Sequence, residues 1–384
     1  MIMKKKIFTS LGLMSGTSMD GVDLSIIKSD GYNEFSSVLN VYREFDNEIY
    51  QKLTNLRDKI IDINDLKVHS EILKDLEKKF TLFNAKIISE IINNSDHEID
   101  LIGFHGQTIF HKANIKVSKQ LGDGKLLSSL TKKIVVNNFR QNDLNHGGEG
   151  APLTPIFHNL ISKIVNKKFQ VKLPINIINI GGITNVTQIV EYSNDVKKNF
   201  FAYDIAPGNC LIDQWVRKHS KSKFDKYGNY AASGKVDNLI LNQAIDNFEI
   251  KSFDKSLDIK DFDLSFVKGL SFEDGCATLT KFTGYLISDG LKKINERNNI
   301  FSNDYILCGG GRKNNFLMKT ISEFLDNKNI NLTDIDNYNF DGNFIESQAF
   351  AFLAIRSYLN LPISFPNTTR CKKAISGGKV FQNF

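Results

Sequence analysis

Two similar hairpins, far apart in the chain, constrain this sequence most strongly. The first joins an apolar run from Ile7 to Met14 to another from Val22 to Ile27. The second joins Ile175–Ile180 to a return strand over 186–190. In both, the turn is polar and rich in glycine, as expected for a β-hairpin tip. The repeated plan predicts a duplicated α/β fold with one hairpin opening each half.

The first tip has the residue types of a phosphate-binding loop. Glycines let backbone N–H groups approach an anion, and hydroxyls add donors. Asp20 and Asp23 could hold a hydrated divalent cation, directly or through water. No lysine follows the glycines and a strand comes next, so this is not a Walker loop. Taken alone, such a segment is more often an ordinary tight hairpin. The residues expected to bind the nucleotide phosphates are Gly16, Thr17, Ser18, Met19, Asp20, Gly21, Val22 and Asp23, preceded by Gly12.

Two further glycine-rich points fit a nucleotide site. The second hairpin turns at Gly181-Gly182-Ile183-Thr184-Asn185. The run Cys308-Gly309-Gly310-Gly311-Arg312 follows a short strand and leads into a helix at 314–325. A strand, a glycine turn and a helix in this order allow a nucleotide to approach the backbone, although a triple glycine alone is weak evidence for such a site. Together with the hairpins, these turns predict an α/β ATPase with a duplicated βαβ core and nucleotide in an interdomain cleft. Its expected cofactor contacts from the second half are Gly181, Gly182, Asn185, Gly208, Asn209, Gly309, Gly310 and Gly311.

The intervening sequence predicts a scaffold of helices and short strands. Apolar residues spaced three and four apart predict helices over 65–93, 154–166 and 345–359. Strands are expected at 100–104 and 133–137, with polar residues just past their ends, where α/β proteins bind ligands. The glycine and proline cluster at 147–152 fits a domain hinge and a ligand-binding loop equally well.

Asp204 is the best candidate for a general base. It follows an apolar-aromatic strand and precedes a Pro-Gly turn, which predicts a fixed position in a loop. Without further context, an Asp at such a turn is more often a capping residue.

Five polar residues are candidates for the substrate side. His105 lies between glycines, which predicts an accessible ring, and Gln107 beside it could bond a sugar hydroxyl. Arg140 with Asp143 offers a guanidinium for a carboxylate or phosphate. Structural roles are also open. His105 could be a buried histidine with its hydrogen bonds satisfied, and Arg140 and Asp143 could form a surface ion pair. Glu346 could complement the dipole of the last helix.

Composition narrows the class of protein. The 384 residues suffice for two domains, and 41% hydrophobic with 24% charged residues is typical of a soluble globular chain. The net charge is +6, and the basic residues are scattered along the chain, which argues against a basic stripe that binds nucleic acid. The basic start resembles no export signal, and no apolar run is long enough for a membrane span. No metal or disulfide spacing is present among the four cysteines, which favours a reducing cytoplasm: Cys210, Cys276, Cys308 and Cys371.

Taken in order, these motifs resemble the anhydro-N-acetylmuramic acid kinases of bacterial cell-wall recycling. The resemblance spans nearly the whole chain, although residues 251–262 match only a subset of that family. It rests on Gly12-Leu-Met-Ser-Gly-Thr-Ser-Met-Asp-Gly-Val-Asp23, His105-Gly-Gln-Thr108, Phe139-Arg140, Gly147-Gly-Glu-Gly-Ala-Pro-Leu153, Asn179-Ile-Gly-Gly-Ile183 with Asn185, Asp204 with Pro207-Gly-Asn209, and Cys308-Gly-Gly-Gly311.

The resemblance implies a two-domain fold of the actin, sugar-kinase and heat-shock-chaperone ATPase type. It implies ATP and Mg²⁺ as cofactors and an anhydro amino sugar as substrate, whose 1,6-bridge is opened by water while O6 is phosphorylated. Asp204 would then deprotonate the water, and 309–311 would approach the nucleoside. We expect one domain at 1–136 plus 346–384 and the other at 137–345. A homodimer is compatible with the sequence, which fixes no oligomeric state.

Two other functions remain open from sequence. One is a kinase of the same superfamily that phosphorylates a free sugar hydroxyl. The other is a non-enzymatic nucleotide switch, as actin and chaperone relatives are, although no appended partner domain or low-complexity tail is visible.

Overall fold

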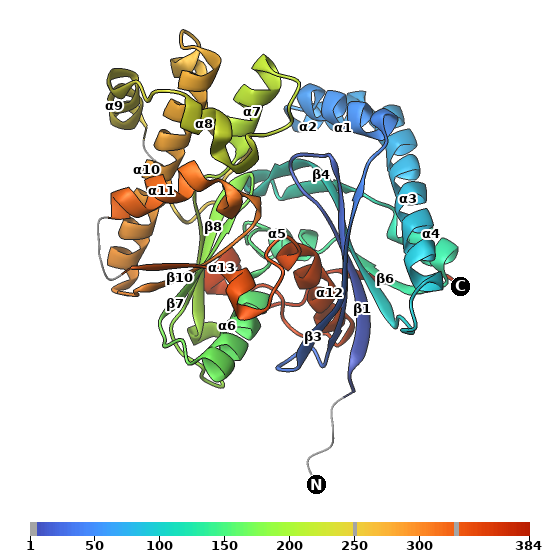
Figure 1. Ribbon diagram of the computed structural model, residues 1–384. Coiled ribbons are helices and arrows are strands. Elements are labelled where there is room, and N and C mark those ends of the chain that lie inside the picture. Colours follow the sequence, from blue (N-terminus) through green and yellow to red (C-terminus); the bar gives the residue numbers. More distant parts are fainter. Residues whose placement is uncertain (1–5, 249–251, 326–329) are drawn as a thin grey trace. The chain divides into compact units, whose positions relative to one another are not determined.

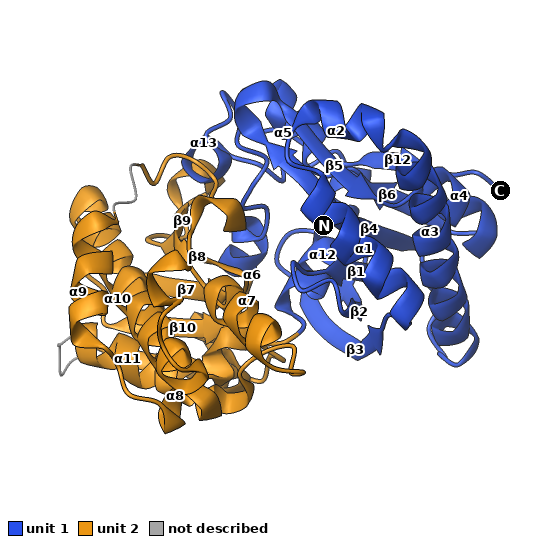
Figure 2. Cartoon of the chain, turned by 90° about the horizontal axis from the view of Figure 1, so that it is seen from above, with its two compact units in different colours: residues 1–160, 344–384 blue, residues 161–343 orange. Residues whose placement is uncertain are grey.

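The computed structural model describes residues 6–248, 252–325 and 330–384, and the chain forms two compact units. Unit 1 comprises Met1–Leu160 with Phe344–Phe384, and unit 2 comprises Ile161–Asn343 (Figure 2). The predicted division instead gave residues 137–160 to the second domain. They lie in unit 1 because Asn137 ends a strand of its sheet and because Arg140 and Asp143 bond residues of that unit.

Unit 1 contains a seven-stranded mixed sheet in the order β12-β6-β4-β1-β2-β3, with β5 paired to β4 (Figure 1). Its strands are β1 (Phe8–Ser15), β2 (Gly21–Ser29), β3 (Phe35–Glu44), β4 (Leu101–Lys112), β5 (Val117–Leu121), β6 (Ile134–Asn137) and β12 (Lys379–Phe381). Its helices are α1 (Asn47–Lys59), α2 (Ile63–Val68), α3 (Ser70–Asn93), η1 (Ala113–Ile115), α4 (Gly124–Thr131), α5 (Gln141–Asn145), α12 (Ile345–Tyr358) and α13 (Pro366–Thr369), and α6 (Pro155–Phe169) leads into unit 2.

Unit 2 contains a five-stranded sheet in the order β11-β10-β7-β8-β9. Its strands are β7 (Ile175–Ile180), β8 (Ile183–Ile189), β9 (Phe200–Pro207), β10 (Asp304–Cys308) and β11 (Asn331–Asp334). Its helices are η2 (Val196–Lys198), α7 (Cys210–His219), η3 (Lys226–Gly228), α8 (Asn229–Ser233), α9 (Asn238–Asn247), η4 (Ile259–Asp261), η5 (Ser265–Val267), α10 (Phe272–Asn298), η6 (Gly310–Lys313), α11 (Asn315–Leu325) and η7 (Ile335–Tyr338).

The two sheets share one strand plan. In unit 1, β1, β2 and β3 form an antiparallel meander, while β4 and β6 continue from β1 in parallel. In unit 2, β7, β8 and β9 form the meander, while β10 and β11 continue from β7 in parallel. This repetition confirms the predicted duplicated α/β fold.

Three predicted elements differ from the structure. The helix expected over 65–93 is divided at His69, whose ψ of 17° leaves the helical region; α2 before it has its own capping box from Asp62 and Asp65. Strand β4 does not end at 104 but runs to Lys112, because β5 pairs with its second half. Strand β9 continues through Asp204 to Pro207, because β8 pairs with it over that length, so Asp204 does not lie in a loop.

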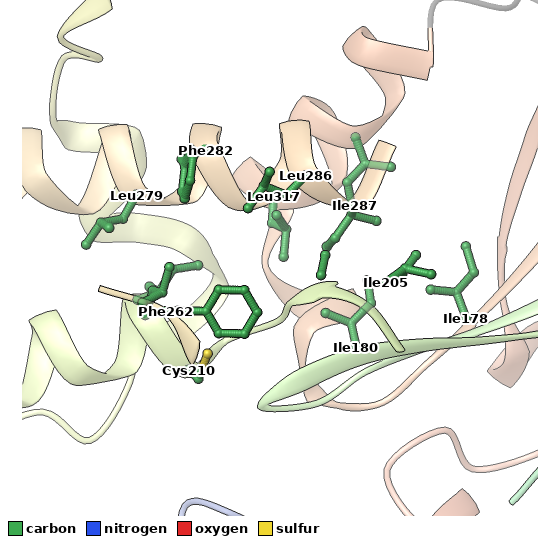
Figure 3. Packing of buried hydrophobic residues seen from close by; sticks show 14 of the residues in the cluster. Ile178, Ile180, Ile205, Cys210, Phe262, Leu279, Phe282, Leu286, Ile287 and Leu317 are labelled. Carbon is green, nitrogen blue, oxygen red and sulfur yellow. The ribbon is translucent and has the colours of Figure 1, made fainter. Parts of the chain in front are cut away.

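A long helix closes one face of the unit 2 sheet. Figure 3 shows Ile287 of α10 above Ile180 and Ile205 of the sheet, and Phe282 of the same helix above Phe262. Trp215 of α7 is fully buried in the same cluster, and its Nε1 donates to Phe272 O. Because packing at this density fixes the strands, the turns at their ends are held in place as well.

Unit 1 places different side chains on the two faces of β1. Leu11 and Leu13 pack into the core beneath α1 and α3, whereas Gly12 faces α12. A Cβ atom at Gly12 would lie 2.0 Å from Ser347 O, and one at Gly103, its neighbour in β4, would lie 2.2 Å from Phe350 O. Gly12 therefore permits close helix packing, not the anion approach that the sequence suggested.

This close packing predicts a specific loss of stability in Gly103→Ala. Alanine normally costs a strand less than glycine, but here the methyl group would collide with the α12 backbone, so we expect a loss of about 1–3 kcal/mol. The midpoint of urea unfolding, followed by circular dichroism, measures it. Gly269→Ala is the control, since no atom lies within 4 Å of the added Cβ there. Equal midpoints for Gly103→Ala and Gly269→Ala would contradict the packing described.

Candidate active site

The tip of the first hairpin is a closed turn. Met19 N donates to Gly16 O at 3.2 Å, and the Ser18 hydroxyl donates to the Asp20 carboxylate at 2.5 Å. Met19 has φ of +58° and buries its side chain in the core, as Val22 does. Only backbone groups of Met19 and Val22 are thus left for a ligand, while Thr17 at the apex is exposed.

Gln107 supports this tip from β4. Its Nε2 donates to Gly16 O at 3.1 Å, its side chain is buried, and the register pairs it with Ser15. Within the described residues, its Oε1 has no hydrogen-bond partner. The donor that the sequence assigned to a sugar hydroxyl therefore holds the hairpin tip against β4.

His105 is buried, which corrects the expectation of an accessible ring. It is 4% exposed and packs on Phe350, with ring centroids 4.4 Å apart. Arg140 donates to its Nε2 at 3.0 Å, so the ring proton is on Nδ1 and is donated to Gly106 O at 2.8 Å. Burial, and then the Arg140 charge, hold the pKa of His105 well below its usual value. The imidazole is therefore a neutral acceptor that orients Arg140.

Arg140 and Asp143 bond the carbonyl and the N–H group of Gly150, respectively. Arg140 Nη1 donates to Gly150 O at 2.8 Å, and Gly150 N donates to the Asp143 carboxylate at 2.6 Å. Asp143 also accepts from the Thr369 hydroxyl, and burial raises its pKa. The predicted guanidinium and carboxylate thus fix the glycine-rich loop at 147–150. Glu346, the remaining predicted substrate residue, lies half-buried in the first turn of α12.

Three glycine turns of unit 2 meet at the end of its sheet and form what we call the glycine rim: 181–182, 208–209 and 309–311. Gly208 N donates to Gly182 O at 2.8 Å, and Asn209 N donates to Gly181 O at 2.8 Å. A Cβ atom at Gly309 would lie 2.4 Å from Asn179 Oδ1, so the third turn runs against the end of β7. Segments distant in sequence are thereby assembled into one backbone surface.

Asp204 lies beside this rim, opposite Asn185 in the β8–β9 ladder. It is 7% exposed, and one carboxylate oxygen accepts from Leu257 N at 3.0 Å. The bond from Leu257 N fixes the direction of the carboxylate, as a positioned general base requires. Sequence reasoning missed Leu257 because the segment 251–262 matches only a subset of the family and gave no motif there. Lys251 of that segment lies outside the described residues.

The described part of the chain holds no cluster of three or more His, Cys, Asp or Glu side chains suited to a metal ion. Asp20 and Asp23 remain the predicted oxygen ligands, and two carboxylates supplemented by water suit Mg²⁺ better than a closed protein cage does. None of the described helices has the length and apolarity that a membrane span requires.

The duplicated sheets with glycine turns at their edges define a two-unit α/β protein. A family model described as anhydro-N-acetylmuramic acid kinase matches residues 8–383. Curated proteins named anhydro-N-acetylmuramic acid kinase are similar throughout. The one from Pelagibacter ubique is 54% identical over 99% of this chain and 100% of its own, and the one from Brucella canis is 35% identical over 96% and 97%. A solved activator of the 2-hydroxyisocaproyl-CoA dehydratase from Clostridium difficile aligns with 91% of this chain and 94% of its own at 12% identity and a TM-score of 0.40. The chain belongs to the anhydro-N-acetylmuramic acid kinase family.

Buried neutral histidines predict acid sensitivity in unit 1. Burial lowers the pKa of His111 to about 4 and that of His158 to about 3, and His105 shifts in the same direction. The unfolded chain takes up protons below about pH 6.5 while the folded one does not, so stability is complete above that pH and falls below it. Asp143, with its raised pKa, offsets part of this loss near pH 4.

We expect each such histidine to contribute about 1.4 kcal/mol per pH unit between about pH 5.5 and 4.5. Urea unfolding at stepped pH should show a slope reduced by that amount in His111→Gln. The control is His97→Gln, which makes the same substitution at a partly exposed position. A slope in His111→Gln equal to that of wild type would show that His111 is protonated in the folded protein.

Proposed function

We propose that this protein is an ATP-dependent kinase that opens 1,6-anhydro-N-acetylmuramic acid with water and phosphorylates O6. The products are N-acetylmuramic acid 6-phosphate and ADP, and the reaction belongs to bacterial cell-wall recycling. Family membership supports the substrate and reaction. The observation that carries the proposal for the site is Asp204, a buried carboxylate that accepts a hydrogen bond from Leu257 N beside the glycine rim.

The reaction couples two substitutions through one oxygen. Asp204 takes a proton from water as the water oxygen bonds to the anomeric carbon and the C1–O6 bond breaks. The released O6 then bonds to the γ-phosphorus, the bond to the β–γ bridging oxygen breaks, and ADP leaves. The order is favourable because bridge opening creates the nucleophile, so the protein has only to position the reactants.

The nucleotide contacts are proposed at turns whose glycines let backbone N–H groups approach a ligand. We propose that the hairpin tip at 16–23 binds the phosphates and that the glycine rim binds the nucleotide, with 309–311 on the nucleoside. Asp20 and Asp23 would hold Mg²⁺, partly through water, and the ion would neutralise phosphate charge. The Ser18 bond to Asp20 supports this role, since it fixes the carboxylate within the turn.

The sugar side is assigned to unit 1. We propose that the loop at 147–150, fixed by Arg140 and Asp143, contacts the amino sugar together with Glu346. His105 and Gln107 support this surface from β4 through Arg140 and Gly16. We also propose a cytoplasmic location, where ATP is available, and a homodimer.

Heavy-oxygen labelling tests the proposal. With ATP, Mg²⁺ and the anhydro sugar in heavy-oxygen water, the 6-phosphate product should carry one heavy oxygen on the anomeric carbon and none in the phosphate. Asp204→Asn should lower the rate by about 10² to 10⁴. Asp246→Asn, an exposed carboxylate of the same unit, is the control and should retain wild-type activity.

Unlabelled product kept in heavy-oxygen water for the same time corrects for exchange at the anomeric position. Phosphorylation of open N-acetylmuramic acid, but not of the anhydro sugar, would replace the proposal with a free-hydroxyl kinase. Full activity of Asp204→Asn would remove Asp204 as the base.

A further inference from the structure

The side chain of Arg312 is fully buried directly after the triple glycine. Its Nη1 donates to Gly309 O at 2.9 Å, while Nε bonds Asp334 at 2.9 Å and Nη2 bonds Asp336 at 2.7 Å. Asn343 Oδ1 accepts from Nη1 as well, at 3.1 Å. Burying a guanidinium is costly, and pairing with two carboxylates and two neutral oxygens offsets this cost. Sequence reasoning stopped at the three glycines and gave Arg312 no role.

The segment that holds Arg312 also holds the turn by its backbone. Gly309 N donates to Gly342 O at 3.1 Å, and Gly342 N donates to the Asp336 carboxylate at 2.6 Å. Gly309 is thus fixed on both sides, with its N–H bonded to Gly342 and its carbonyl bonded to Arg312. Its φ of 80° and ψ of 167° are accessible to glycine alone, so these bonds stabilise an unusual conformation.

The direction of the next N–H follows from peptide geometry. In a planar trans peptide, the carbonyl and the following N–H point in opposite directions. Because Gly309 O points to the buried guanidinium, Gly310 N–H points away from it, and Gly310 is exposed. Arg312 therefore determines which face of the glycine turn is offered to a ligand.

Charge adds to this geometry. Asp334 and Asp336 place two carboxylates next to a turn that is to accept an anionic nucleotide. Arg312 bonds both, so without it their negative charge beside the turn would be less compensated.

We propose that Arg312 is a positioning residue for nucleotide binding, since it holds the glycine turn 309–311 in its binding conformation. This inference rests on the proposed function. Arg312 touches neither the base nor the sugar side, so its loss should weaken the affinity for ATP and ADP. It should leave the KM for the sugar and the kcat at saturating ATP near their wild-type values.

Two variants test the inference. Arg312→Lys keeps the charge but loses the fork of donors. Gly342→Ala keeps Arg312 but adds a Cβ atom 2.7 Å from the guanidinium carbon, so the guanidinium must leave its bonded position. We expect each to raise the Kd for ADP, measured by titration calorimetry, about 10-fold. The control is Arg217→Lys on α7, whose side chain bonds Lys223 O and should leave the Kd unchanged.

The outcomes separate this inference from the proposed function. If wild type binds ADP and both variants bind it as tightly as Arg217→Lys, the inference is wrong and the proposed function stands. If the sugar KM and kcat change as much as the Kd for ADP, Arg312 is merely structural. If Arg312→Lys does not fold, Gly342→Ala decides the question alone. If wild type binds no ADP, both proposals fall.

Discussion

Both sheets depend on the parallel pairing of the first hairpin strand with a strand that returns much later in the chain. In unit 1, β1 pairs with β4, and in unit 2, β7 pairs with β10. Parallel strands bring their carboxyl ends to one edge of a sheet, where α/β proteins bind ligands. The hairpin tip therefore meets Gln107, and the end of β7 at Asn179 meets Cys308 and the triple glycine. Gly208 and Asn209 are placed separately, since they follow β9, which pairs with β8 in antiparallel fashion.

Glycine serves two separate purposes in this arrangement. Gly12 and Gly103 leave room for the backbone of α12 and belong to the packing of unit 1. Gly208 and Gly309 allow turns to approach other backbone segments, and Gly309 also takes a conformation that other residues avoid. A substitution of the first kind should destabilise the protein, whereas one of the second kind should also alter the surface offered to a ligand.

Local patterns predicted much of the fold. The alternation of polar turn and apolar run located β1, β2, β7 and β8, and the duplication followed from their repetition. The pairing between strands could not be read in the same way: β5 pairs with β4 from Gln107 to Lys112, and β8 pairs with β9 through Asp204. His105 was expected to be accessible because glycines flank it, yet Phe350 and Arg140 cover it from other parts of the chain. Leu257 and Arg312 act through tertiary contacts that no local spacing records.

The central proposal is that the glycine rim of unit 2 and the hairpin tip of unit 1 each contact the nucleotide. Hydrogen–deuterium exchange of the full chain with and without ADP and Mg²⁺, followed by peptide mass spectrometry, tests it most directly. We expect added protection in peptides that contain 16–23, 181–182, 208–209 and 309–311, and little change in exposed helices such as α9. Saturation with ADP that leaves these four segments unprotected, or protects other segments in their place, would contradict the assignment.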